Sequence, residues 1–280
     1  MNISDRMKGY EQAWDIRMPA RMPVIIRLDG NSFSKLTRKM GFEKPYDTTF
    51  RSMMFQTTKS VLEYCSGAVI GYTQSDEISI LLNNYTSLES EPFLANRIQK
   101  LTSLTASVAA SAFNMVLDPA SIENLAAFDC RVFVLPESEV NNYFLWRQQD
   151  AFRNCVSSYC HYKIGDALGR GTADAMIHGR NINEQQELLF KHTGINIDGV
   201  PTWQKRGFCL RHVLRKIPMK DALSKEALEK VIKIHGKIPD EDVVRGSWEP
   251  DFEIPLFNLD TGYIWRGGSD ENKSTSSSCC

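Results

Sequence analysis

The sequence carries almost no net charge and contains no long apolar run. Its 280 residues include 33 Lys and Arg against 34 Asp and Glu, which gives a formal charge of −1. No basic field surrounds the whole molecule, so any contact with nucleic acid must use local patches. No stretch approaches the roughly 18 consecutive apolar residues that suggest a membrane span, so we expect no membrane contact. Short basic runs, which form either such patches or ordinary solvated faces, occur at Lys35, Arg38 and Lys39, at Lys205 and Arg206, and at Arg211, Arg215 and Lys216.

Paired cysteine motifs are missing as well. The seven cysteines include no Cys-x-x-Cys pair, and their number is odd. These features argue against a disulfide framework or a zinc ribbon and favour a reducing compartment, so we expect a cytoplasmic protein. The first twenty residues contain no apolar signal core and are too acidic for a typical transit peptide. The Ser/Thr-rich end that closes with Cys279 and Cys280 is expected to be disordered.

What the sequence does contain is a regular order of strands and helices up to Pro136. Apolar runs bounded by turn residues predict strands, and apolar residues at steps of three and four predict helices. The order strand, helix, strand, strand, helix, strand is typical of the split βαβ, ferredoxin-like pattern of the α+β class. In chain order we expect a strand at 23–28, a short helix or turn at 31–39, a helix from Thr48 capped by Asp47, strands at 68–73 and 78–82, a helix at 94–116 and a strand at 131–135.

The remainder of the chain follows a different pattern. After Pro136 we expect a helix to about His161, then a glycine-rich and again helical segment, a strand within 205–217 and a helix at 221–235. We therefore divide the chain into a catalytic core, residues 1–136, and a helical and mixed extension, residues 137–280, that packs on the core.

Two carboxylates interrupt the pattern of the first half. Asp29 and Gly30 follow the apolar run Val24–Ile26, and Asp76 lies in the polar turn between the second and third predicted strands. In a ferredoxin-like sheet the first strand lies beside this hairpin, so both carboxylates are expected at one end of the sheet. Converging acids repel unless a cation separates them, and Mg²⁺ is the natural cation because it binds one or two carboxylates together with substrate phosphates. The alternative is that Asp-Gly and Ser-Asp-Glu are ordinary turn sequences.

The surrounding residues fit phosphoryl chemistry. Two metal ions about 3.5–4 Å apart activate a hydroxyl and stabilise a leaving phosphate oxygen. The carbonyl of Gly30 is a further candidate ligand, and the amides of residues 31–33 begin the next predicted helix, where phosphates bind favourably. Glu77 follows Asp76 directly and points to the other side if the strand geometry continues.

Six segments, in this order, carry a resemblance to a known family. The sequence resembles the tRNA-His guanylyltransferase superfamily, and within it the guanylyltransferase-like proteins that act as 3′-to-5′ polymerases. The resemblance spans about residues 20–210. Its segments are RLDGNSF (27–33), KPYDTTF (44–50), GYTQSDEISILL (71–82), FDCRVFVLP (128–136), YFLWRQQDAFRN (143–154) and LLFKHTGINIDGVPTWQKRG (188–207).

The resemblance implies a fold, a cofactor and substrates. The family has a palm domain like that of conventional polymerases, uses two Mg²⁺ ions with ATP and GTP as substrates, acts on tRNA and tends to form homotetramers (dimers of dimers). By resemblance the metal ligands are Asp29, Gly30 and Asp76, and the catalytic residues are Asp29, Asp76 and Glu77. The residues expected to contact nucleotide are Asp29, Gly30, Asn31, Ser32, Phe33, Ser34, Lys44, Asp47, Ser75, Asp76, Arg97 and Lys100. Those expected to contact tRNA are Arg147, Arg153, Asn154, Lys205 and Arg206.

One departure from the family pattern is informative. After the WRQ-D motif, enzymes dedicated to histidine tRNA carry a His-Ile-Asn-Asn signature, whereas this chain has Ala151, Phe152, Arg153 and Asn154. Only the final Asn agrees. The resemblance therefore favours the branch that repairs 5′-truncated tRNA by copying the opposite strand of the acceptor stem. The alternatives are dedicated addition of G to histidine tRNA, a palm-fold nucleotide cyclase, and a non-catalytic RNA-binding protein of the same fold.

Overall fold

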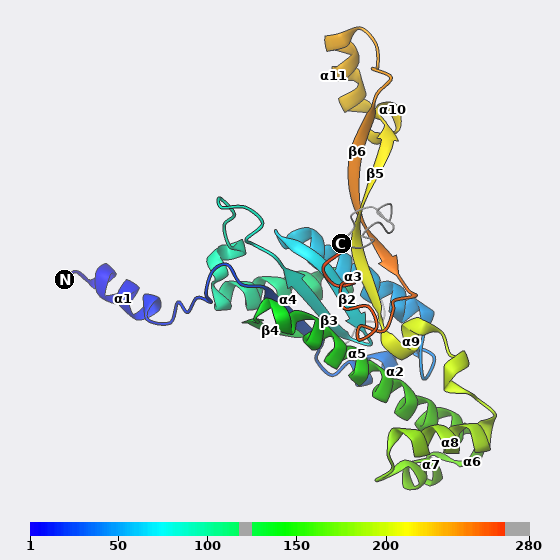
Figure 1. Cartoon of the computed structure of the whole chain (residues 1–280). Coiled ribbons are helices and arrows are strands. Elements are labelled where there is room, and N and C mark those ends of the chain that lie inside the picture. Colours follow the sequence, from blue (N-terminus) through cyan, green and yellow to red (C-terminus); the bar gives the residue numbers. More distant parts are fainter. Residues whose placement is uncertain (118–124, 267–280) are drawn as a thin grey trace, which may run out of the picture.

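Figure 1 shows the computed structural model, which describes residues 1–117 and 125–266, as a twisted sheet with helices on both faces and a long hairpin that projects from it. Neighbouring strands are antiparallel, and the strand order is β4-β1-β3-β2-β5-β6. The strands are β1 (Val24–Gly30), β2 (Ala68–Gln74), β3 (Glu77–Leu82), β4 (Phe128–Val134), β5 (Phe208–Pro218) and β6 (Asp242–Asp251).

The first four strands confirm the predicted ferredoxin-like βαββαβ pattern and the α+β class. The helices of this unit are α3 (Thr48–Tyr64) and α4 (Ile98–Met115), with the short α2 (Phe33–Lys39) directly after β1. The ends of these elements agree with the sequence prediction to within about four residues, which is the usual error of element boundaries.

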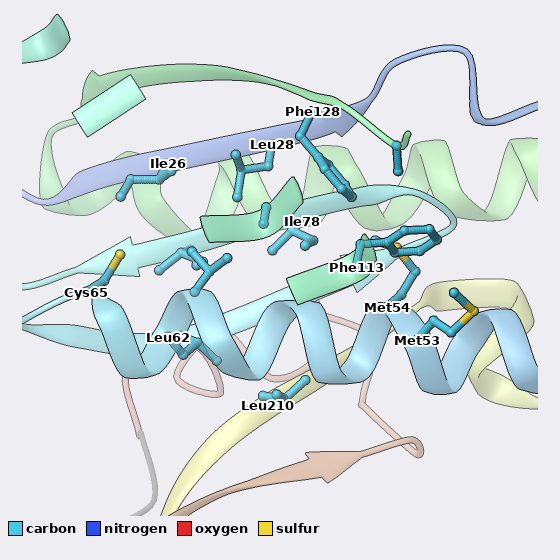
Figure 2. Close-up of a cluster of buried hydrophobic side chains, with 14 of the residues drawn as sticks. Ile26, Leu28, Met53, Met54, Leu62, Cys65, Ile78, Phe113, Phe128 and Leu210 are labelled. Carbon is cyan, nitrogen blue, oxygen red and sulfur yellow. The ribbon is translucent and has the colours of Figure 1, made fainter. Parts of the chain in front are cut away.

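One face of the sheet packs against α3 and α4. Alternate residues of a strand point to opposite faces, so Ile26, Leu28 and Ile78 all face these helices. They form a cluster with Met54 of α3 and Phe113 of α4 (Figure 2), and all five side chains are 0% exposed. Fully burying a side chain of this size contributes about 1.5–3 kcal/mol, so this layer holds the central strands firmly in place.

The opposite face packs against α5 (Glu137–Tyr159). Val140 and Phe144 of this helix contact Ile25, Tyr72 and Leu81, the strand residues that alternate with those of the first cluster. The strands β1, β2 and β3 are thus covered on both faces, which explains why Ile25 and Ile26 are both apolar although they point in opposite directions.

The chain after α5 forms a helical lobe and then returns to the sheet. The lobe has its own apolar cluster, centred on Cys155, Cys160 and Leu189. β5 then pairs with β2, so the extension beyond residue 137 completes the sheet of the first half. The elements of the lobe are η3 (Cys160–Ile164), α6 (Gly165–Leu168), α7 (Arg170–Ile177), α8 (Ile182–Thr193), η4 (Ile197–Gly199) and α9 (Thr202–Arg206).

Several elements were not predicted. β6 extends β5 into a long hairpin that carries α10 (Met219–Ala222) and α11 (Lys225–His235) at its far end, away from the body of the molecule (Figure 1). Of these, α11 matches the helix predicted at 221–235, whereas β6 was not predicted. Also unpredicted are α1 (Ile3–Gln12), η1 (Phe93–Asn96), η4 and α9. The predicted disordered tail lies outside the described residues. Within residues 1–117 and 125–266, no helix is long and apolar enough to cross a membrane.

Candidate functional site

The ends of β1 and β3 bring the predicted carboxylates together. Asp29 pairs with Glu77 in the register of these two strands. The amide of Gly30 donates a hydrogen bond to the carbonyl oxygen of Asp76 at 3.1 Å. Ser75, with φ 51°, and Asp76 form the two-residue turn between β2 and β3, and so short a turn holds Asp76 beside the end of β1.

Burial and mutual repulsion act on both carboxylates. Burial raises the pKa of Asp76 to about 6, and the charges of Asp29 and Glu77 add to this rise. Burial also raises the pKa of Asp29, and so does Asp129, which pairs with Asp29 from β4. A cation between the carboxylates would relieve both effects, because an opposite charge favours the ionised form.

Glu77 is held by a buried ion pair. Its Oε1 accepts a hydrogen bond from Arg147 Nε at 2.7 Å, and the two side chains are only 11% and 7% exposed. Arg147 also donates to Asp150 Oδ2 at 2.7 Å. Burial raises the pKa of Glu77, and the guanidinium of Arg147 limits that rise. The guanidinium of Arg147 is enclosed between Glu77 and Asp150 in this structure, and its contact with RNA stays a prediction.

A cleft of about 570 Å³ opens beside these residues. Its walls come from the start of α2, the loop before α3, the β2–β3 turn, α5 and α9. The predicted site residues that line it are Asp29, Phe33, Ser34, Lys44, Asp47, Ser75, Asp76, Glu77, Arg147 and Asn154.

Of the predicted nucleotide contacts that follow Asp29, Phe33 and Ser34 line the cleft, whereas Gly30, Asn31 and Ser32 do not. A Cβ atom at Gly30 would lie 2.4 Å from the ring of Phe33, so only glycine fits there. The amide of Asn31 donates to the carbonyl oxygen of Ala127 at 2.8 Å and is not free for a phosphate, contrary to the prediction for this amide. Ser32, at φ 59°, is the residue before α2.

Lys44 and Asp47 lie in the loop that leads into α3. Lys44 Nζ donates to Thr37 Oγ1 at 2.9 Å, and burial lowers the pKa of the lysine. Burial acts to raise the pKa of Asp47, but hydrogen bonds from three backbone amides outweigh it and lower that pKa. These bonds come from Phe50, Glu43 and Thr49, so both oxygens of Asp47 are occupied in capping α3 and closing the loop before it.

Two predicted nucleotide contacts do not reach the cleft. Arg97 Nε donates to Asp15 Oδ1 at 2.5 Å, and residue 97 forms an isolated bridge with Arg17. Arg97 thus contacts the segment that precedes β1, whereas Asp29 lies at the other end of that strand. Lys100 is exposed one turn further along α4. Neither residue lines the cleft.

The predicted RNA-binding residues other than Arg147 lie on two adjacent helices. Arg153 is 48% exposed and donates to Asp150 at 2.9 Å, while Asn154 lines the cleft one residue further along α5. Lys205 Nζ donates to the carbonyl oxygen of Asp198 at 2.7 Å. The backbone carbonyl oxygen of Arg206, the last of the set, accepts a hydrogen bond from the hydroxyl group of Tyr72.

Sequence reasoning missed two acidic neighbours of the site. Asp129 was overlooked because the strand was expected to begin at residue 131, whereas β4 begins at Phe128 and places residue 129 opposite Asp29. Asp150 is the second residue: it links Arg147 to Arg153. Its spacing of three from both arginines on a predicted helix was the available signal.

The donor set suits Mg²⁺ better than a metal bound entirely by protein. Within the part of the chain that the structure describes, no group of three or more His, Cys, Asp or Glu side chains is arranged to hold a metal. The candidate metal ligands are therefore two carboxylates, Asp29 and Asp76, and the carbonyl oxygen of Gly30. This set fits an ion that completes its coordination with substrate phosphates and water.

Comparison with known proteins finds relatives that are described as tRNA(His) guanylyltransferases or as guanylyltransferase-like proteins. A family model described as tRNAHis guanylyltransferase matches residues 4–136. A solved bacterial tRNA(His) guanylyltransferase-like protein in complex with ATP is 35% identical, with a TM-score of 0.75 and coverage of 94% of this chain and 97% of that one. A solved bacterial protein of the same description in complex with GTP is 36% identical, with a TM-score of 0.68 and coverage of 94% and 96%. A probable tRNA(His) guanylyltransferase of Drosophila melanogaster is 28% identical over 89% of this chain and 83% of its own length.

Proposed function

The chain belongs to the tRNA(His) guanylyltransferase superfamily and is a nucleotidyltransferase, and from this premise we propose that it repairs the 5′ end of truncated tRNA by template-dependent 3′-to-5′ addition. The observation that carries the proposal is the meeting of Asp29 and Asp76 at the end of the sheet, in a cleft with room for a nucleotide. ATP or GTP first activates the 5′-phosphate of the RNA and releases pyrophosphate. The 3′-hydroxyl of the incoming nucleotide then displaces the activating nucleotide at the same phosphorus.

Asp29, Asp76 and the carbonyl of Gly30 are the proposed Mg²⁺ ligands. When bound, two such ions neutralise phosphate charge and lower the pKa of an attacking hydroxyl. Both reactions are displacements at phosphorus, so positioning and charge neutralisation contribute most of the catalysis. The carboxylates serve this role because the strand that carries Asp29 and the strands that flank the turn of Asp76 are fixed by packing on both faces.

Glu77 is proposed to act as a supporting carboxylate. Its bond to Arg147 fixes its orientation beside Asp29, and the burial of both partners keeps water from competing for that bond. We infer that Arg147 positions Glu77 and that RNA contacts come from exposed groups such as Arg153 and Asn154.

The segment that replaces the histidine signature supports template control. Ala151 is 3% exposed, and Phe152 packs against the apolar cluster of the helical lobe. The side chains of Ala151 and Phe152 offer no polar group for reading a specific tRNA. Watson–Crick pairing with the acceptor strand is then left to select the incoming nucleotide. Assembly as a dimer of dimers and a cytoplasmic location stay predictions.

The decisive experiment uses 5′-truncated, 5′-monophosphorylated tRNAs whose opposing base is varied through all four nucleotides. With ATP, Mg²⁺ and each nucleoside triphosphate in turn, addition should follow the complement of the opposing base, on histidine and other tRNAs alike. Addition of G whatever the opposing base, and only to histidine tRNA, would instead assign the chain to the dedicated enzymes. A cyclic product formed from labelled ATP without RNA would identify a cyclase.

A further inference from the structure

Arg51 is a cation in the cleft that the proposed mechanism does not use. It lies on α3 one turn after Asp47 and lines the cleft. Its guanidinium carbon is 4.8 Å from the centroid of the Trp203 ring and 4.5 Å from that of the Phe252 ring. Trp203 belongs to α9, and Phe252 follows β6. Aromatic residues from two other parts of the chain therefore hold this guanidinium in place.

The side chain of Arg51 has no polar partner among the described residues. It makes no hydrogen bond or ion pair there, and its Nε is buried without an acceptor. An arginine cannot give up its charge, and a buried charged donor without an acceptor is unfavourable. The two aromatic faces stabilise the cation but accept no hydrogen bond from its buried Nε.

The other cations of the cleft are already bound. Among the described lining residues, the two further cations are Arg147, which pairs with Glu77 and Asp150, and Lys44, which donates to Thr37. Two acidic lining residues are also occupied, Asp47 as the cap of α3 and Asp150 of α5 by two arginines. The cleft thus contains a positioned cation that pairs with none of the described carboxylates and is available to an anionic ligand.

We propose that Arg51 is an anion-binding residue that receives a phosphate group of the substrate. This inference rests on the proposed function, in which both substrates carry phosphate: the nucleoside triphosphate and the 5′ end of the RNA. A planar guanidinium matches two phosphate oxygens with parallel N–H groups. Because Trp203 and Phe252 already fix its plane, little side-chain freedom is lost on binding.

The test is equilibrium dialysis of the full chain in the presence of Mg²⁺, with ATP, adenosine and an RNA oligonucleotide bearing a 5′-phosphate or a 5′-hydroxyl. Arg51→Met should weaken binding of a phosphate-bearing ligand by about 10- to 100-fold and leave adenosine and 5′-hydroxyl RNA unchanged. Arg51→Lys should recover part of the loss, since lysine keeps the charge without the planar fork.

A matched control is available on the same helix. Lys59 lies two turns beyond Arg51, forms an exposed pair with Glu63 at 3.8 Å and does not line the cleft. Lys59→Met changes the charge by the same amount and should leave all four ligands bound as in the wild type. If Arg51→Met does not fold, as judged by its thermal unfolding, Arg51→Gln removes the charge and keeps polar N–H groups.

Each possible result of the dialysis experiment either supports or overturns the inference about Arg51. A loss confined to ATP identifies the nucleotide polyphosphate as the anion, and a loss confined to 5′-phosphorylated RNA identifies the RNA end; both support the inference. Unchanged binding, an equal loss for adenosine, or a wild type that binds neither phosphate ligand overturns it. Dialysis requires no turnover, so a wild type that binds ATP but fails to extend tRNA contradicts the proposed function alone.

Discussion

The carboxylate end of the sheet and the projecting arm, residues 211–249, are built in opposite ways. β1, which carries Asp29, and β3, which carries Glu77, each pair with a neighbouring strand on both sides. The apolar side chains of these two strands are fully buried. No side chain of the arm is buried, and Leu214, Ile234 and Val244 are 49%, 75% and 60% exposed. An isolated two-stranded hairpin is at best marginally stable in water. The position of the site is therefore fixed by the sheet core, and the arm contributes little to it.

The largest expected effect is on catalysis at the carboxylate end. Asp29→Ala and Asp76→Ala each remove a proposed metal ligand and should lower the rate of nucleotide addition by at least about 10³-fold, since a bound metal supplies several kcal/mol of charge stabilisation. Thermal unfolding should stay at or above the wild-type temperature, because burial disfavours the ionised form of each carboxylate and raises the pKa of both. Near wild-type turnover of either variant at saturating Mg²⁺ would contradict the two-metal assignment.

Arg147→Ala should be the most destabilising change at this end. It leaves Glu77 buried without its partner, and breaking such a pair by removing one member costs about 3–5 kcal/mol. Denaturant unfolding measures this cost. The matched double variant, Arg147→Met with Glu77→Leu, removes both charges and should recover most of the stability while activity remains low. No recovery in the double variant would mean that packing of the arginine, rather than charge, is what was lost.

The raised pKa of Asp76 predicts a pH dependence of stability in metal-free protein. The folded state holds the proton up to about pH 6, whereas the ordinary value is 3.8. The contribution of this proton to the free energy of unfolding is therefore complete below about pH 4 and is lost as the pH rises through 6. Relative to pH 7.5, it should amount to about 1 kcal/mol at pH 5. The measurement is the difference in unfolding free energy between wild type and Asp76→Asn in EDTA at both pH values; a difference that does not change with pH would refute it.

The same contrast explains what the sequence could and could not predict. The strands around Asp29 and Asp76 were predictable because alternating apolar residues, a two-residue turn and a helix cap at Asp47 all indicate the same fold. The Glu77–Arg147 pair was not, because its members are 70 positions apart and meet only after α5 packs across the sheet. β6 was missed for a different reason: in the arm neither face is buried, so no apolar alternation marks the strand.

The smallest expected effect lies in the arm and has a direct counterpart in the core. Ile234 of α11 is 75% exposed, whereas Ile80 of β3 is 0% exposed and packs between the sheet and α3. The same change to alanine should cost about 2–5 kcal/mol at Ile80, where it leaves a cavity, and less than about 0.5 kcal/mol at Ile234, where the side chain already faces water. Denaturant unfolding at one protein concentration compares the two variants directly. A cost at Ile234 that approaches the cost at Ile80 would show that another surface covers the arm in solution, and the contrast between the two regions would then hold only within a single chain.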